Sequence, residues 1–151
     1  MKVSKYNSEG YHDPTTYEAF MNIEREKKQA QLDKLARSIR GYKPLVYICS
    51  PYAGNSVPVN IVNARRYCKF AADTGHNPFA PHLFYTQFLD DSQPHERKLG
   101  MQLGMIMLTK CAEMWVFGEV ISPGMEREIA KAEARAMRIR YFTSDCQEVR
   151  T

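Results

Sequence analysis

One carboxylate of this sequence stands where a reactive group can be expected. Glu126 lies in the segment 122–126, which opens a helix directly after the apolar run 113–118. That run is typical of a buried strand, so Glu126 falls in the first helical turn at a strand's C-terminal end, the edge where open α/β sheets bind ligands. The free N–H groups there keep a carboxylate ionised, and such a group can attack a sugar carbon as a covalent nucleophile. An acid that only stabilises its own helix is the alternative.

Two further segments carry polar groups that can contact a ligand. The loop 50–56, after a short apolar run at 45–49, matches neither the dinucleotide fingerprint nor the P-loop, so it argues against both chemistries. Its small and polar residues can still hold a phosphate or sugar through backbone N–H groups, although a plain strand-to-helix turn is equally consistent. His82 can act as a base or fill a structural role, and Ser50 lacks the glycines of a nucleophile elbow.

Composition excludes several classes of protein. The 151 residues suffice for one domain with a core, and the net charge of +4 is interleaved with acids, so we expect no nucleic-acid partner. The four cysteines and four histidines have no metal-ligand spacing, so no metal and no redox cofactor is implied. The N-terminus has no apolar signal segment, and no stretch approaches the ~18 apolar residues of a membrane span. We therefore expect a cytoplasmic protein without a membrane partner.

Hydrophobic patterning predicts an alternating α/β chain. Strands and helices that alternate in this way form right-handed crossovers and a parallel sheet covered on both faces. We therefore predict a three-layer Rossmann- or flavodoxin-like fold at 44–143, preceded by an N-terminal arm and helix at 1–43 and followed by a tail at 144–151. The segment 82–94 is expected to be a long irregular loop. The predicted strands are 45–49, 77–81, 113–117 and 139–142, and the predicted helices are 14–40, 57–74, 96–110 and 123–137.

The sequence resembles the nucleoside 2-deoxyribosyltransferase-like superfamily. The segment 46–54, Val-Tyr-Ile-Cys-Ser-Pro-Tyr-Ala-Gly, looks like the first strand and loop of these proteins, and Gly124-Met-Glu126 looks like the motif that carries their catalytic glutamate. The resemblance covers roughly 44–143 and is closest to a DUF4406-like branch common in bacteria and their mobile elements. It implies a transferase or hydrolase, an N-glycosidase in the broad sense, that acts on nucleosides or nucleotides.

The resemblance also implies roles for single residues. Glu126 matches the nucleophile, and Tyr47 matches a first-strand tyrosine whose hydroxyl orients it. Relatives complete their sites with neighbouring subunits, which implies a homodimer or a higher homo-oligomer. The remaining predicted contacts, all expected to bind substrate, are Ser50, Pro51, Tyr52, Gly54, Asn55, His82, Ser122, Gly124 and Met125.

One departure from the family pattern leaves two functions open. Relatives carry an aspartate before the third strand that helps protonate the departing base, whereas the matching stretch 103–112 contains no acid. A retaining glycosyl transfer uses two carboxyl groups ~5 Å apart. Asp90 or Asp91 can supply the missing acid; otherwise the chain is a nucleotide-binding or sensing module without turnover. A third alternative, an interaction protein acting through the helix 14–40, rests on that helix's polar middle.

Overall fold

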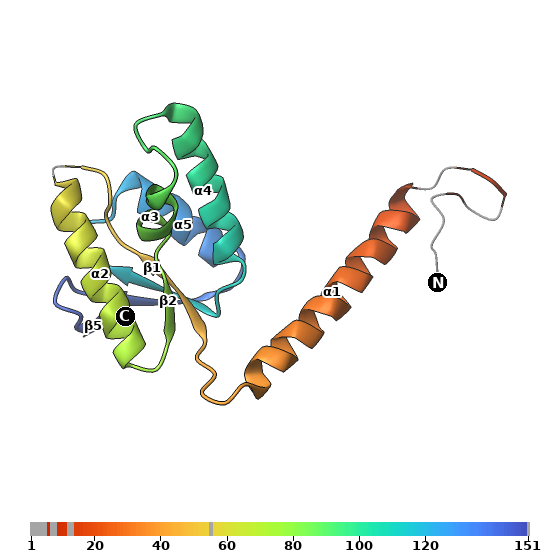
Figure 1. Cartoon of the computed structure of the whole chain (residues 1–151), viewed down its shortest axis with the longest axis horizontal. Coiled ribbons are helices and arrows are strands. Elements are labelled where there is room, and N and C mark those ends of the chain that lie inside the picture. The colour runs from red at the N-terminus through yellow and green to blue at the C-terminus, as the bar shows by residue number, and fades with distance from the viewer. Residues whose placement is uncertain (1–5, 7–8, 12–13, 55, 151) are drawn as a thin grey trace. The chain divides into compact units, whose positions relative to one another are not determined.

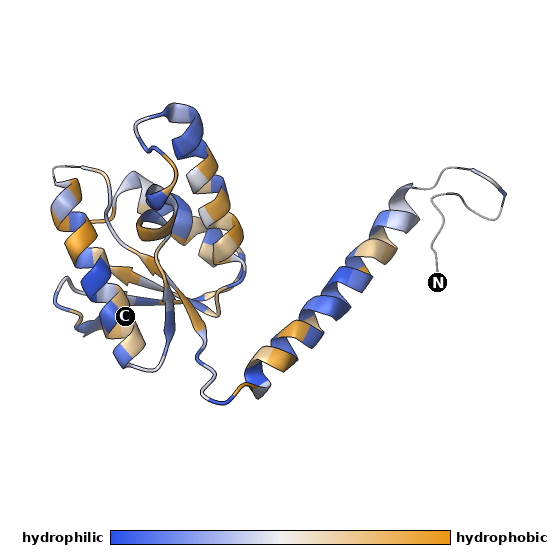
Figure 2. Ribbon diagram, in the orientation of Figure 1, coloured by the Kyte–Doolittle hydropathy of each residue, from blue (hydrophilic) through white to orange (hydrophobic). Residues whose placement is uncertain are grey.

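A computed structural model describes residues 6, 9–11, 14–54 and 56–150. The chain divides into two compact units, Met1–Tyr42 and Lys43–Thr151, and each is described by itself. The first unit is built around α1 (Pro14–Ser38), one continuous helix along which no residue is buried. Figure 2 shows hydrophilic residues over most of the length of α1, with apolar positions near its ends.

The second unit contains a five-stranded sheet in the order β2-β1-β3-β4-β5. The first four strands are parallel and β5 pairs antiparallel with β4 (Figure 1). β1 and β3 occupy the middle of the sheet and are almost wholly buried, because their near-continuous apolar runs face helices on both sides. The strands are β1 (Leu45–Cys49), β2 (Asn77–Phe79), β3 (Glu113–Phe117), β4 (Arg138–Phe142) and β5 (Glu148–Val149).

The sheet is covered by helices on both faces, which confirms the expected α/β fold. Proline stands in the first turn of each of the longer helices, where its missing N–H costs no hydrogen bond. No helix in the described part of the chain is long and apolar enough to cross a membrane. The helices are α2 (Val57–Asp73), α3 (Pro81–Phe84), the 3-10 turn η1 (Tyr85–Gln87), α4 (Pro94–Leu108) and α5 (Pro123–Ala134).

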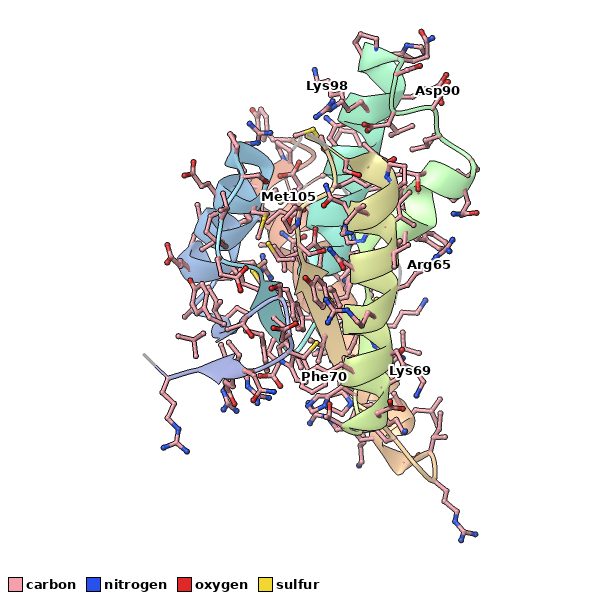
Figure 3. The ribbon with its side chains drawn as sticks, turned by 90° about the vertical axis from the view of Figure 1, so that its left-hand side faces the viewer. Arg65, Lys69, Phe70, Asp90, Lys98 and Met105 are labelled. Carbon is pink, nitrogen blue, oxygen red and sulfur yellow. The ribbon has the colours of Figure 1, made fainter. Side chains whose placement is uncertain are left out.

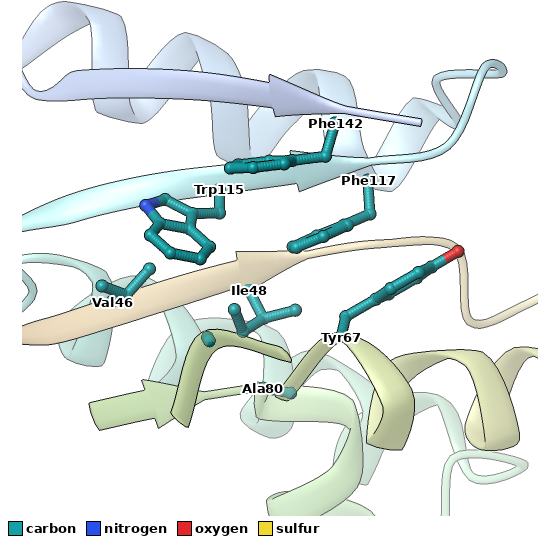
Figure 4. Packing of buried hydrophobic residues seen from close by; sticks show 8 residues of the cluster. Val46, Ile48, Tyr67, Ala80, Trp115, Phe117 and Phe142 are labelled. Atoms are coloured by element: carbon teal, nitrogen blue, oxygen red, sulfur yellow. The ribbon is translucent and has the colours of Figure 1, made fainter. Parts of the chain in front are cut away.

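Alternate residues of each strand build two separate cores. On the α2 face, Tyr67 stacks on Phe117 with ring centroids 4.2 Å apart, and Phe117 stacks on Phe142 at 4.9 Å. Figure 4 shows these rings in a row above Ile48 of β1. The opposite face packs Tyr47 and Cys49 of β1 beneath α4 and α5. A strand turns successive side chains to opposite faces, so β1 contributes to both cores.

Two local features differ from the sequence prediction. The segment 82–94 is not wholly irregular, because α3 and η1 fold its first part into helical turns. Aromatic packing explains the difference: Tyr85 and Phe84 lie edge to face with ring centroids 5.2 Å apart, and both contact Phe79 of β2. The predicted tail also contains β5, which Glu148 secures by accepting bonds of 2.8 and 2.9 Å from Arg140.

Candidate functional site

A cavity of about 430 Å³ opens beside the loops that follow β1 and β3. These two neighbouring strands lead to helices on opposite faces of the sheet. β1 is followed by α2, which packs on one core, and β3 is followed by α5, which packs on the other. Such a topological switch point is where doubly wound sheets bind ligands. The volume lies within the range of small-molecule sites. The segments 50–54 and 122–128 supply opposite parts of the lining, and α4 supplies a third wall.

A hydrogen bond between Tyr47 and Glu128 lies in this cavity. The Tyr47 hydroxyl donates to Oε1 of Glu128 over 2.8 Å, joining residues 81 positions apart. Tyr47 points from the middle of β1, where its side chain is only 1% exposed. Both residues line the cavity, so a bound molecule can reach the carboxylate.

The periodicity of α5 explains why Glu128 lies there. Met125 and Ala132 are buried against β1 and β3, and Glu128 stands three residues after the first and four before the second. Residues with these spacings share one face of a helix. Glu128 therefore occupies a core-facing position that an apolar residue would ordinarily fill. A charged residue in phase with the apolar face is the sequence signal that identifies it.

The structure places the sequence-predicted nucleophile differently. Glu126 is exposed on α5 and lies outside the cavity lining, and Tyr47 is bonded to Glu128 instead. The two glutamates are two residues apart, about 200° around a helix, so they face nearly opposite directions. The hydrogen bond of the Tyr47 hydroxyl thus goes to Glu128 and not to the predicted Glu126. The prediction from the motif used only the position of Glu126 in the first helical turn. It did not take into account which face of α5 packs on the sheet.

Burial controls the ionisation of this pair. Removal from water is the main cause that raises the pKa of Glu128 above its usual value, opposed by hydrogen bonds from Cys49 and Tyr47 and by the nearby Arg127. Burial, followed by the charge of Glu128, raises the pKa of Tyr47, so its hydroxyl stays protonated and remains a donor. The arrangement holds a carboxylate of enhanced basicity against a permanent donor.

Ser50, Tyr52 and His82 form a second group in the cavity. The Ser50 hydroxyl lies 3.3 Å from Nε2 of His82, and the Tyr52 and His82 rings are 5.5 Å apart between centroids. Burial lowers the pKa of His82 to about 4, so the imidazole is neutral at physiological pH. The side chain of Asn60 fixes the loop by donating to the Tyr52 carbonyl over 2.9 Å. This wall can offer neutral hydrogen-bonding groups to a sugar.

The α5 N-terminus completes the wall nearest Glu128. The Ser122 hydroxyl caps the helix by accepting from the Met125 backbone N–H over 3.3 Å. Gly124 follows Pro123 in the first turn, and all of these residues line the cavity. The first-turn N–H groups and the partial positive charge of the helix end favour an anionic or strongly polar ligand group here.

Charged residues stand on the cavity wall formed by α4 and the loop before it. Oδ2 of Asp91 lies 3.7 Å from Nη1 of Arg97, and both residues line the cavity. The carboxylate of the neighbouring Asp90 already accepts hydrogen bonds from the backbone N–H and the hydroxyl of Ser92. Asp91 is therefore the better placed of the two aspartates to meet a ligand.

The structure brings most of the predicted contacts to one cavity. Of the predicted residues that lie in the described part of the chain, Pro51 and Glu126 fall outside the lining. Asn55 lies outside the described residues. Sequence reasoning missed Glu128, Arg97 and Arg127, whose chemistry is marked by no motif. Those brought together are Tyr47, Ser50, Tyr52, Gly54, His82, Ser122, Gly124 and Met125.

The basic side chains of α2 do not line this site. Arg65 and Lys69 project from the outer side of α2, as Figure 3 shows, and Arg66 donates to the Ser144 carbonyl. Lys69 also pairs with Asp73 one helical turn away. Among the described residues, no group of three or more His, Cys, Asp or Glu side chains could hold a metal ion.

Comparison with known proteins places the chain in a family and a fold. Residues 44–142 match the family described as Domain of unknown function (DUF7768), and the chain belongs to this family. The family is thus DUF7768 and not the DUF4406-like branch expected from the sequence. No curated protein matches the chain.

A solved 2-deoxyribosyltransferase from the psychrotolerant bacterium Bacillus psychrosaccharolyticus has a similar structure, with a TM-score of 0.52. The two chains are 14% identical, and the match covers 71% of this chain and 77% of the other. At this identity the likeness shows a shared fold alone. Function must be argued from the site itself.

Proposed function

We propose that this protein breaks or exchanges the N-glycosidic bond of a nucleoside or nucleotide, with Glu128 as the nucleophile. The observation that carries the proposal is the hydrogen bond of 2.8 Å between Tyr47 and the half-buried Glu128 inside the cavity. A buried carboxylate is costly to a fold, and one that lines a ligand-sized cavity with a perturbed pKa is a candidate for catalysis. The fold shared with a 2-deoxyribosyltransferase supports the same reaction class.

The reaction proceeds in two balanced steps. A Glu128 oxygen attacks the anomeric carbon, a C–O bond forms, and the C–N bond breaks with its electron pair leaving on the base. The departing base gains a proton from an acid in the cavity. A second base or a water molecule then attacks the same carbon, returns a proton to that acid and releases the Glu128 carboxylate. Tyr47 holds the carboxylate throughout, since its hydroxyl remains a donor.

We assign the acid that serves the departing base to Asp91. Its carboxyl group lines the cavity with Arg97, whereas Asp90 is occupied by Ser92. Asp91 can deliver the proton directly or through an ordered water. This assignment supplies from another element the group that the stretch 103–112 lacks. Ser50 and Ser122 are the proposed sugar or phosphate contacts.

Two matched variants test the nucleophile. The protein is incubated with a panel of nucleosides and 5′-monophosphates, and released base is measured by chromatography. Glu128→Gln removes the attacking charge and should lower turnover by a factor on the order of 10³ or more. Glu126→Gln, on the exposed side of α5, should retain it. Equal losses in both variants, or full activity of Glu128→Gln, would reject the assignment.

Trypsin separates the two glutamates, which gives a direct chemical test. Cleavage after Arg127 leaves Glu126 in the peptide 111–127 and Glu128 in the peptide 128–131. A 2-fluoro-substituted substrate, whose glycosyl-enzyme is hydrolysed slowly, should add its sugar to the peptide 128–131. A sugar on 111–127 would restore Glu126 as the nucleophile.

A nucleotide-binding module without turnover is the second candidate. It is favoured by the absence of any carboxylate in the stretch 103–112. Calorimetric binding of a nucleoside or 5′-monophosphate with no released base would support it. We also propose a cytoplasmic location and self-association of the chain.

A further inference from the structure

The residues of α4 that line the cavity form one stripe along the helix. They recur at intervals of three and four residues, so they share one face. A Cβ atom added to Gly104 would lie 3.5 Å from the Tyr47 hydroxyl oxygen, which places this end of the stripe beside the Tyr47–Glu128 pair. Arg97 stands seven residues earlier, about 10 Å along the helix axis. The stripe consists of Glu96, Arg97, Gly100, Met101, Gly104 and Met105.

The middle of this wall is apolar and suits a flat ring. Met101 stands midway between Arg97 and Met105 in the stripe. A Cβ atom added to the neighbouring Gly100 would lie 3.6 Å from Leu89 and 3.9 Å from Tyr85, so these two cavity residues pack against the same turn of α4. Methionine sulfur contacts aromatic rings favourably. A nucleobase has apolar faces and polar edges, so its faces fit this part of the cavity.

The far end of the stripe is charged but does not suit an anion. Nη1 of Arg97 lies 3.7 Å from Oδ2 of Asp91, which is wider than a hydrogen bond, so the guanidinium keeps donors available for a ligand. Asp91 and Glu96 both line this end, and their negative charges disfavour a phosphate group beside Arg97. A sugar or phosphate is favoured instead at the first turn of α5, near Glu128. The polar edge of a base is the group that remains for Arg97.

Resting on the proposed function, we propose that Arg97 determines specificity and selects 6-oxopurine nucleosides by donating a hydrogen bond to the 6-oxygen of the base. The distance of about 10 Å between the levels of Gly104 and Arg97 has to hold the attack distance, the base and this hydrogen bond, which favours two fused rings over one. A guanidinium only donates, so it binds a carbonyl oxygen but not an amino group. Arginine binds the O6 and N7 edge of guanine in DNA in the same way.

The same orientation gives Asp91 a defined target. Atom N7 adjoins the 6-oxygen on the purine edge, and Asp91 adjoins Arg97 on the cavity wall. As Glu128 attacks and the bond between the anomeric carbon and N9 breaks, its electron pair passes into the purine ring. N7 takes the proton of the Asp91 carboxyl group, and Arg97 stabilises the charge that grows on the 6-oxygen. The base leaves as a neutral purine, and Asp91 remains as a carboxylate beside Arg97.

A binding measurement tests this selection without turnover. 2′-Deoxyinosine carries the 6-oxygen, and 2′-deoxyadenosine carries an amino group in its place. Each is titrated calorimetrically into the full chain carrying Glu128→Gln, which lacks the attacking carboxylate. Deoxyinosine should bind roughly tenfold or more tightly than deoxyadenosine. Arg97→Met in the same background should remove that preference, and Arg97→Gln, whose amide can accept from the amino group, should reverse it.

Lys98→Met is the matched control. It removes one positive charge from the same turn of α4, but Lys98 does not line the cavity. This variant should keep the preference for deoxyinosine. Equal binding of the two nucleosides before substitution at 97, an unchanged preference in Arg97→Met, or loss of the preference in Lys98→Met would overturn the proposal.

Release of base by the chain that retains Glu128 separates this inference from the proposed reaction. If the binding preference follows Arg97 but no base is released from deoxyinosine, recognition of the base by Arg97 is upheld and the reaction is rejected. If base is released from both nucleosides with equal kcat/KM, and Arg97→Met changes neither value, the reaction is upheld and selection by Arg97 is rejected.

Discussion

A Cβ atom added to Gly104 would lie 3.5 Å from the Tyr47 hydroxyl oxygen and 3.3 Å from Cβ of Pro81. Gly104 is buried in α4, and the added atom would be in ordinary contact with Tyr47 and in tight contact with Pro81. Glycine in a helix interior costs about 1 kcal/mol relative to alanine. The tight contact with Pro81 favours a glycine here.

Gly104→Ala is expected to disturb the pair while Gly100→Ala stabilises the helix. The new methyl at 104 would lie so close to Pro81 that Pro81 must shift by a few tenths of an ångström, so packing strain should offset the gain in helix propensity, and crowding beside the Tyr47 hydroxyl should lower turnover. At position 100 the nearest atoms are 3.6 and 3.9 Å away, which is ordinary contact. Gly100→Ala should add about 0.5–1 kcal/mol to the free energy of unfolding in urea. Equal stabilisation by both substitutions would contradict the tight fit at 104.

Glu128→Gln is expected to stabilise the fold as pH rises. Because burial raises the folded-state pKa of Glu128 above its unfolded value, the stability it contributes is complete below the unfolded pKa and is lost as pH rises through the folded pKa. The neutral amide does not suffer this loss. At pH 8 the variant should melt a few degrees above the wild type, and the difference should shrink toward pH 4.

Glu126→Gln serves as the opposite control in the same melting series. Its exposed carboxylate stands in the first turn of α5, where a negative charge favours the helix. Losing that charge should cost about 0.3–1 kcal/mol at neutral pH. If Glu128→Gln destabilised the protein at pH 8 as much as Glu126→Gln does, the charge of Glu128 would not be costly to the fold.

His82 should make the fold sensitive to mild acid. Its folded pKa of about 4 lies below the ordinary value of 6.5, so the unfolded chain binds the proton more readily between these values. Stability attributable to His82 should be complete above pH 6.5 and fall by about 3 kcal/mol as pH drops to 4. Urea unfolding of wild type and His82→Gln at several pH values isolates this contribution, and parallel pH profiles would contradict it.

The cysteines are expected to resist alkylation in the folded protein. Burial raises the pKa of Cys68 to about 11 and that of Cys111 to about 12, so thiolate is scarce at pH 8. Iodoacetamide followed by mass spectrometry should label these residues slowly in buffer and rapidly in denaturing urea. Fast labelling of Cys111 in buffer would show that the α4 end of the core opens readily.

The sheet was the part of the fold that the sequence predicted best. β1 and β3 are short apolar runs bounded by turn-forming residues, and the helix-strand alternation between them fixes a parallel arrangement. The helical turns of α3 and η1 were missed because they depend on contacts between Phe84, Tyr85 and Phe79, which local sequence does not reveal.

Most of the residues predicted for the site line one cavity, but the sequence did not indicate which glutamate accepts from Tyr47. The predicted ends of the strands indicated the edge of the sheet at which Tyr47, Ser50 and Ser122 line the cavity. The choice between Glu126 and Glu128 depends on which face of α5 packs on β1, and the motif carried no such information. Asp91 lies in the loop before α4 and Arg97 in α4 itself, and no spacing rule specifies that these two residues line the cavity.

α1 is expected to mediate self-association. Leu32 and Leu35 of α1 are 49% and 62% exposed, and Ile39, directly after the helix, is 62% exposed. Isolated helices are marginal in water, and exposed apolar stripes of this kind mark interfaces, most often of symmetric dimers. Light scattering should therefore give about twice the 17.4 kDa chain mass.

Substitution along that stripe tests which surface is responsible. The triple variant Leu32→Gln, Leu35→Gln, Ile39→Gln should scatter as a monomer, because glutamine keeps the helix while removing its apolar contacts. Val59→Gln with Val62→Gln supplies the control, since these α2 side chains are 55% and 61% exposed and equally apolar. A wild type that stays at 17.4 kDa at every concentration would reject self-association, and a control variant that alone becomes monomeric would move the interface from α1 to α2.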